Sequence, residues 1–186
     1  PTRASDYDLV IRNARVLDRM GNPWILADLA IRDGRFVKIG KVPERGTREI
    51  DARGLYVSPG WIDMMDQSGG ALLRNGNADN KLRMGVTTAI GGEGGFPVAA
   101  SGIAEYWKTL ERQGISINFG NYYSQTQARV GAMGRVARRP TTAEMAQMKA
   151  SMDTAMRAGA MGMTTALIYP PSSYTTTDEL IEVAKV

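Results

Sequence analysis

The sequence predicts an α/β protein in which a small β-rich module precedes four strand-helix units. Up to Val57 apolar and polar residues alternate with period two and glycine-containing turns separate the runs, a pattern typical of β-strands. From Ser58 onward, short apolar runs alternate with helical patterns, which is typical of a parallel sheet. The predicted strands end in polar or glycine-rich segments, where such folds place functional residues. Two domains, 1–57 and 58–186, are therefore expected.

In the first domain the most specific signal is Asp33-Gly34, a favoured two-residue hairpin turn between two alternating segments. Leu9 and Ile11 mark the early strands, and Ala52-Arg53-Gly54 is expected to form a further turn. A mostly antiparallel module of about fifty residues is marginal by itself. We therefore expect it to pack on a larger body.

The second domain is predicted to contain four strands, over residues 61–65, 86–90, 115–119 and 161–168. Helices are predicted over 78–84 and 101–113, and a long polar loop over 121–139. These units fit either an open four-stranded sheet or the first half of a (β/α)8 barrel. A complete barrel needs about 250 residues, and the sequence stops within a helical pattern. The half barrel is favoured, and its other half is expected as further polypeptide or as a second chain.

The clearest helix signals follow Pro140. Thr141 and Glu144 form a capping box, and Gly159 is the expected stop. Methionines and an alanine recur at helical spacing, and we interpret this stripe as core packing; it consists of Met145, Met148, Met152 and Ala155. Thr176 with Glu179 predicts a second capping box and a last helix.

The composition excludes several kinds of site. The chain has no cysteine and no histidine, so a metal site built from it must use carboxylates, hydroxyls, amides or lysine. The net charge of +4 comes from scattered basic residues, so nucleic acid is not an expected partner. The sequence contains no run of eighteen apolar residues, so no membrane span is expected. Residues 1–5 are interpreted as a processed N-terminal end. A soluble protein is expected, and the sequence leaves open whether it is cytoplasmic, periplasmic or secreted.

Glu93 is the first candidate site residue. Two glycines flank it on each side at the end of the second predicted strand, which would give a substrate or metal close access to its carboxylate. A solvated loop glutamate is the alternative. Met65 and Gln67 end the first predicted strand, and Met65 is the better candidate for packing because thioethers bind hard cations poorly.

The segment after the third predicted strand is both polar and aromatic. Arg129 could hold a carboxylated substrate through its guanidinium, with help from Tyr122, Tyr123 and Gln125. A purely structural loop explains these residues equally well. Tyr169, in the segment 169–174, could form the wall of a pocket, or could belong to a rigid loop that serves stability.

Several motifs resemble the opening of amidohydrolase-superfamily enzymes. They are Tyr7-Asp8-Leu9-Val10-Ile11-Arg12-Asn13, Asp33-Gly34-Arg35, Ile50-Asp51-Ala52-Arg53-Gly54 and Val57-Ser58-Pro59-Gly60-Trp61-Ile62-Asp63. A further set is similar to the D-aminoacylase (N-acyl-D-amino-acid deacylase) branch: Gly85-Val86-Thr87-Thr88, Arg129 with Met133-Gly134, and Gly159-Ala160-Met161-Gly162-Met163-Thr164-Thr165 with Leu167-Ile168-Tyr169-Pro170-Pro171. The resemblance runs through nearly the whole chain.

The resemblance implies a β-sandwich segment, a metal-bearing TIM barrel and a hydrolase that cleaves an amide by metal-activated water. It also implies that the catalytic aspartate and histidine ligands lie in a C-terminal half outside this chain. Met65 and Gln67 stand where the family has His-x-His, Glu93 where the branch has a cysteine ligand, and Gln125 where it has a further histidine. Glu93 could replace the cysteine with an oxygen ligand.

The expected function is therefore that of the N-terminal half of a zinc amidohydrolase. It would hold one zinc ion, shared with residues outside the chain, and act on an N-acyl (D-)amino acid or a small peptide. The alternative is a non-catalytic amidohydrolase-like scaffold or assembly protein that has lost its metal site. The acyl group, the handedness of the substrate and a homo-oligomeric state are left open.

Overall fold

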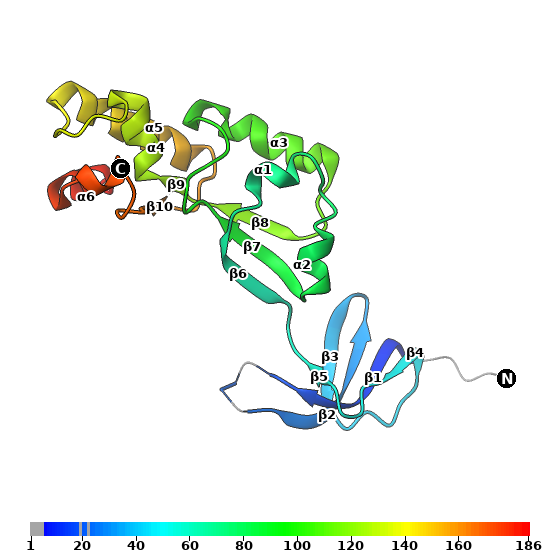
Figure 1. Cartoon of the computed structure of the whole chain (residues 1–186). Helices are drawn as coiled ribbons and strands as arrows, with labels where there is room; N and C mark the ends of the chain where they lie inside the picture. The colour runs from blue at the N-terminus through cyan, green and yellow to red at the C-terminus, as the bar shows by residue number, and fades with distance from the viewer. Residues whose placement is uncertain (1–5, 19, 22) are drawn as a thin grey trace. The chain divides into compact units, whose positions relative to one another are not determined.

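The computed structural model describes residues 6–18, 20–21 and 23–186 (Figure 1). Its internal contacts divide the chain into two units, Pro1–Pro59 and Gly60–Val186. This division falls beside the boundary expected after residue 57. The segment 1–5, interpreted above as a processed end, lies outside the described residues.

The first unit is a five-stranded sheet of order β3-β2-β1-β4, in which β5 also pairs with β1. The strands are β1 (Tyr7–Val16), β2 (Ile25–Arg32), β3 (Arg35–Gly40), β4 (Gly46–Asp51) and β5 (Tyr56–Val57). The pairs β1/β2 and β2/β3 are antiparallel, whereas β4 and β5 both run parallel to β1. The module is thus more mixed than its alternation predicts, because periodicity reports the faces of a strand and not its direction.

The predicted hairpin turn joins β2 and β3. Asp33 and Gly34 both have left-handed backbone, with φ of +52° and +70°. Two successive positive φ angles match the right-handed twist of the flanking strands, and Asp-Gly accepts them readily. The core of this unit includes Val10, Ala14 and Leu29, all buried.

The second unit contains two groups of parallel strands. They are β6 (Trp61–Asp66), β7 (Val86–Gly91) and β8 (Asn118–Asn121), in that order, and the two-residue pair β9 (Tyr123–Ser124) and β10 (Met163–Thr164). The helical elements are α1 (Gly69–Leu72), α2 (Asp79–Arg83), η1 (Ala100–Gly102), α3 (Ile103–Gln113), α4 (Gln125–Met133), α5 (Thr142–Arg157), η2 (Ser172–Tyr174) and α6 (Thr177–Val183). The alternation of strand and helix is therefore present, although the fourth strand is shorter than predicted.

That fourth strand, expected over 161–168, is regular for two residues. Hydrogen bonds from Met161 N to Asn121 O (3.0 Å) and from Tyr123 N to Gly162 O (2.9 Å) continue the pairing irregularly before it. After it the chain turns, with Tyr169 N donating to Ala166 O at 3.3 Å. An apolar run fixes neither where its strand pairing begins nor where it ends, because the partner strand decides both. The half barrel consequently stays a prediction.

The prediction of a long loop over 121–139 was wrong in part, because this segment contains β9 and the helix α4. Ser124 caps this helix, and its hydroxyl oxygen accepts from Thr126 N at 3.2 Å. The buried face of α4 includes Gln125 and Arg129. Because these polar residues share the inward face with Ala128 and Met133, the hydrophobic periodicity that signals a helix is weak.

The predicted capping box of α5 is confirmed. The Thr141 hydroxyl oxygen accepts from Glu144 N at 3.3 Å, and Glu144 Oε2 accepts from Thr141 N at 2.7 Å. Met148 and Met152 are buried in the main core, which confirms their packing role; Met145 is half-buried against the same core. Residues of α3 and of β7 belong to the same core, among them Ile103, Leu110 and Ala89.

Of the two hydrogen bonds expected for the second capping box, the one accepted by Thr176 is present. The Thr176 hydroxyl oxygen accepts from Glu179 N at 3.3 Å, but the Glu179 carboxylate accepts from Arg129 instead of the capping backbone. Arg129 of α4 thus binds the Glu179 side chain that a capping box would use. Among the described residues, no helix combines the length and the apolar character needed to cross a membrane.

Candidate functional site

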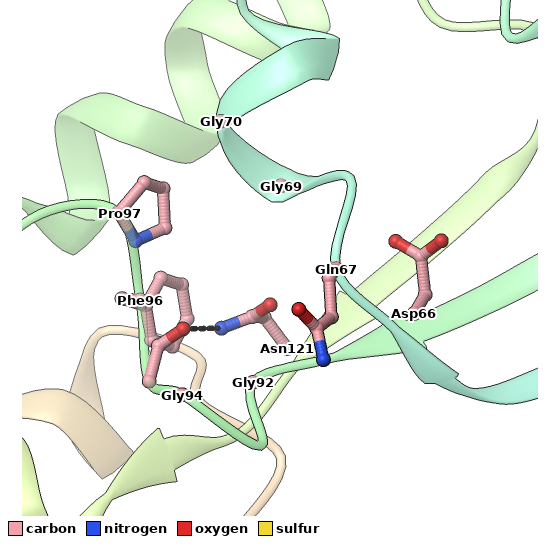
Figure 2. A pocket seen from close by; sticks show the side chains of 10 residues that line it. Asp66, Gln67, Gly69, Gly70, Gly92, Gly94, Phe96, Pro97 and Asn121 are labelled. Atoms are coloured by element: carbon pink, nitrogen blue, oxygen red, sulfur yellow. Dashed lines mark hydrogen bonds between the residues drawn. The ribbon is translucent and has the colours of Figure 1, made fainter.

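A cleft of about 230 Å³ lies at the carboxyl ends of β6, β7 and β8, and we call it the β6–β8 cleft (Figure 2). Its lining consists of Asp66, Gln67, Gly69, Gly70, Gly92, Gly94, Gly95, Phe96, Pro97 and Asn121. Ligands of parallel α/β sheets bind at this end of the strands. The cleft is therefore the candidate functional site of the second unit.

The glycine run after β7 is required by backbone geometry at two positions. Gly92 has φ of +104°, and a Cβ there would lie 2.2 Å from the carbonyl oxygen of Tyr122. Gly95 has φ of +97°, and its Cβ would lie 2.5 Å from Oε1 of Gln127. Other residue types would be strained and would clash at both places. The run therefore forms a tight turn that presents Glu93 between two residues of the cleft, Gly92 and Gly94.

The carboxylate of Glu93 is partly exposed and contacts the end of β6. Nε2 of Gln67 donates to Oε2 of Glu93 at 3.3 Å. Two of the sequence-predicted site residues are thus brought together. Met65 is 69% exposed, so within the described chain it does not have the packing role that the sequence favours.

Lys81 of α2 neutralises two carboxylates of β6. Its ammonium contacts Oδ2 of Asp63 at 2.6 Å and also pairs with Asp66. The hydrogen bond from Lys81 holds the pKa of Asp63 below its ordinary value. Burial by itself would raise the pKa of Asp66, but hydrogen bonds from Lys81 and Ser68 hold it below its ordinary value. Both aspartates are ionised and already engaged with Lys81, so neither presents a carboxylate without a partner to a ligand.

Asn121, at the end of β8, is a site residue that sequence reasoning missed. Its side chain is 2% exposed, and Nδ2 donates to Gly95 O at 3.3 Å and to Tyr122 O at 2.9 Å. It therefore connects β8 to the glycine turn after β7. A polar residue closing the third strand was a usable signal, but the prediction passed over it in favour of the aromatic residues that follow.

The remaining candidates do not line the β6–β8 cleft. Tyr122 is half-buried and Tyr169 is 66% exposed. Tyr123 is 2% exposed, and its hydroxyl is hydrogen-bonded to that of Ser151 at 2.9 Å.

Gln125 and Arg129 meet at one carboxylate. Nη1 of Arg129 donates to both carboxylate oxygens of Glu179 at 2.7 Å, and Nε2 of Gln125 donates to Oε1 at 2.8 Å. All three side chains are buried. This arrangement ties α4 to α6, and a substrate role for Gln125 and Arg129 stays a prediction.

Whether the described residues can bind a metal ion depends on how many ligand side chains lie together. The part of the chain that the structure describes holds no group of three or more His, Cys, Asp or Glu side chains that could bind one. Glu93 offers a single carboxylate, and a zinc site needs at least three protein ligands. Glu93 therefore fits as one ligand, while the described residues do not form a metal site by themselves.

No family model matches the chain. Among curated proteins it is 32% identical to the N-acyl-D-aspartate deacylase of Alcaligenes xylosoxydans xylosoxydans, covering 96% of this chain and 40% of that protein. It is 28% identical to the D-aminoacylase of the same organism, covering 96% of this chain and 42% of the relative. The chain thus spans about two fifths of the length of these relatives.

Solved structures of the same group are similar in fold. A crystal structure of D-aminoacylase that defines a subset of amidohydrolases matches with TM-score 0.85 and 27% identity, over 96% of this chain and 42% of that one. Another D-aminoacylase structure, described for its binuclear metal centre, matches equally well. The N-acyl-D-glutamate deacylase of Bordetella bronchiseptica, complexed with zinc and a phosphonate inhibitor, matches with TM-score 0.80 and 28% identity over the same shares.

Proposed function

The chain matches the N-terminal portion of D-aminoacylase-like amidohydrolases, and we propose that it is that portion of a zinc-dependent hydrolase. The proposed reaction is hydrolysis of the amide bond of an N-acyl (D-)amino acid or small peptide. The similarity over 96% of the chain supports the reaction class. The observation that carries the proposal for this chain is Glu93, whose carboxylate is presented at the carboxyl end of the parallel strands by a turn that requires glycine.

The proposed role of Glu93 is to supply one oxygen ligand to a single zinc ion. The other ligands would come from residues beyond this chain, since the described residues offer no further cluster. When bound, zinc would supply a Lewis acid and an activated water. Gln67 would hold Oε2 of Glu93 in place, as partners behind a metal ligand do. Zinc in the deacylase of Bordetella bronchiseptica is the support for this choice of metal.

The residues predicted to contact substrate fall into an accessible group and a buried group. Tyr122 and Tyr169 have accessible side chains and are proposed to contact substrate. Tyr123, Gln125 and Arg129 are buried and already hydrogen-bonded, so a positioning role suits them better. In that role they would fix α4 and the segment that contains Tyr122.

The proposal also requires further polypeptide to complete the barrel. β6 is an edge strand of the three-stranded sheet, and its Trp61 and Ile62 are each 56% exposed. An open parallel sheet edge with large exposed apolar side chains is unfavourable in water. The remaining length of the relatives, within the same chain or as a second chain, is the proposed cover.

Turnover by protein that includes this remaining portion tests the function. A panel of N-acetyl-D-amino acids, their L forms and dipeptides would be assayed for release of the free amine. We expect hydrolysis of at least one N-acyl amino acid, lost on chelation and restored by zinc. Glu93→Ala should abolish it, while Glu105→Ala, at an exposed surface ion pair, should not. No turnover together with no stoichiometric metal would instead support the non-catalytic scaffold.

A further inference from the structure

We propose that the β6–β8 cleft is a subsite for the N–H group of a small neutral amide, with Oδ1 of Asn121 as the acceptor. The inference rests on the proposed function, because it names the part of an amide substrate that this cleft would recognise. It depends on three features of the described residues: an oriented acceptor, the space in front of it, and the charge of the cleft.

The orientation of the Asn121 carboxamide is fixed by its two donated hydrogen bonds. Both acceptors of Nδ2, Gly95 O and Tyr122 O, are backbone carbonyls. A flipped amide would place its oxygen against them, so the nitrogen must occupy this side. Oδ1 then points to the other side, and the hydrogen bonds that the described residues make with this carboxamide are the two donated by Nδ2.

Asn121 is 2% exposed as a whole residue, but its Oδ1 is not among the fully buried side-chain atoms that lack a partner, so this oxygen is accessible. A ligand that brings an N–H group would give it a hydrogen bond. The Asn121 oxygen and nitrogen are both seen in Figure 2, at the centre of the residues that line the cleft.

Two glycines of neighbouring elements lie close to this oxygen. A Cβ at Gly91 would lie 2.5 Å from Oδ1 of Asn121, and one at Gly69 would lie 3.6 Å from it. Gly69 is held in place by Tyr106, whose hydroxyl donates to Gly69 O at 3.0 Å. The cleft of about 230 Å³ exceeds the roughly 30 Å³ that one water occupies in the liquid. It therefore has room for a small organic group as well as for solvent.

The charge of the cleft favours a neutral donor over a cation. Asp66 is the acidic residue of the lining, and its carboxylate is already engaged by Lys81 and by Ser68 N, the latter at 2.7 Å. No uncompensated negative charge in the lining would therefore attract an ammonium group. Phe96 and Pro97 add apolar surface that suits an acyl or methyl group. An amide bound here would lie beside the turn that presents Glu93.

Two probes of the same shape test the subsite directly. N-methylacetamide has an N–H group, and methyl acetate has an ester oxygen in its place. Both would be titrated into the protein extended by the remaining portion of its relatives, with 15N-labelled glycine. We expect the amide to shift the signals of Gly70 and Gly94 but not that of Gly131, and to bind about fivefold more tightly than the ester. Equal binding of the two probes, or unmoved Gly70 and Gly94 signals, would overturn the proposal.

Variants that fill the cleft provide the second measurement. A Cβ at Gly94 meets no atom within 4 Å, and one at Gly70 meets Pro97 Cβ at 3.9 Å, so both alanines should fold. Gly94→Ala and Gly70→Ala should weaken amide binding about fivefold and raise KM for an N-acyl amino acid. Gly131→Ala, also in open space, is the matched control and should leave both unchanged.

The outcomes separate the subsite from the proposed function. Amide-selective binding without turnover of any N-acyl amino acid would support the subsite and oppose the function. Turnover with the same KM in the parent, Gly94→Ala and Gly70→Ala would oppose the subsite and leave the function standing.

Discussion

The carboxamide of Gln67 donates a hydrogen bond to the carboxylate of Glu93 at 3.3 Å and so joins the end of β6 to the turn after β7. In the family pattern described above, a histidine stands at the first of these positions and a cysteine ligand at the second. Two departures from that pattern are therefore in contact. We interpret the pair as one ligand and its orienting partner.

If Gln67 orients Glu93, removing its amide should weaken metal binding without abolishing it. For Gln67→Ala in protein that includes the remaining portion of the relatives, we expect zinc affinity to fall about tenfold, the lower end of what hydrogen-bond partners of a metal ligand contribute. Calorimetric titration measures this directly. Met65→Leu changes a neighbour that does not contact Glu93 through a hydrogen bond and should leave the affinity unchanged. Equal affinities for all three proteins would show that the Gln67 contact has no role in the site.

The buried ion pair of Arg129 and Glu179 should be a major determinant of stability. Both side chains are at most 1% exposed, so Glu179→Gln would leave a guanidinium uncompensated in the interior. We expect unfolding in urea to show a loss of about 3–5 kcal/mol. The control Glu182→Gln breaks exposed ion pairs and should cost less than about 1 kcal/mol. A similar small loss in both variants would contradict the assignment.

Glu144 should make stability depend on acid pH. Hydrogen bonds from Arg138 and from the Thr141 backbone lower the pKa of Glu144 to about 2, from an ordinary value of 4.5. The folded pKa lies below the unfolded one, so this contribution is complete above about pH 4.5 and is lost as pH falls towards 2. Glu144→Gln should therefore lose less stability than the parent between pH 5 and pH 2. Urea midpoints at both pH values measure this, and identical losses would refute it.

Local signals predicted the features that need only neighbouring residues. Asp33-Gly34 specifies a turn, and Thr141 with Glu144 specifies a helix start, because the residues involved are at most three positions apart in the sequence. The same rule predicted the cap at Thr176, but not that the Glu179 carboxylate would contact Arg129 on another helix. That choice depends on packing between α4 and α6, which no local pattern contains.

The candidate site shows the same division. Glu93 was predicted because two flanking glycine pairs are visible in the sequence. The engagement of Asp66 by Lys81 and the orientation of Asn121 depend on which strand ends lie side by side. The fourth strand was predicted too long because its extent is set by pairing with β9. Residue types therefore pointed to the edge of the sheet where the cleft lies, while the contacts within it required the structure.

The proposed role of Glu93 as a zinc ligand is tested by the metal content of the purified protein. The protein that includes the C-terminal portion of its relatives would be purified, dialysed with zinc and measured by elemental analysis, together with Glu93→Ala and the surface control Glu105→Ala. We expect about one zinc ion per chain in the parent and the control, and a content near zero in Glu93→Ala. A full equivalent of zinc in Glu93→Ala, with unchanged affinity, would contradict the account.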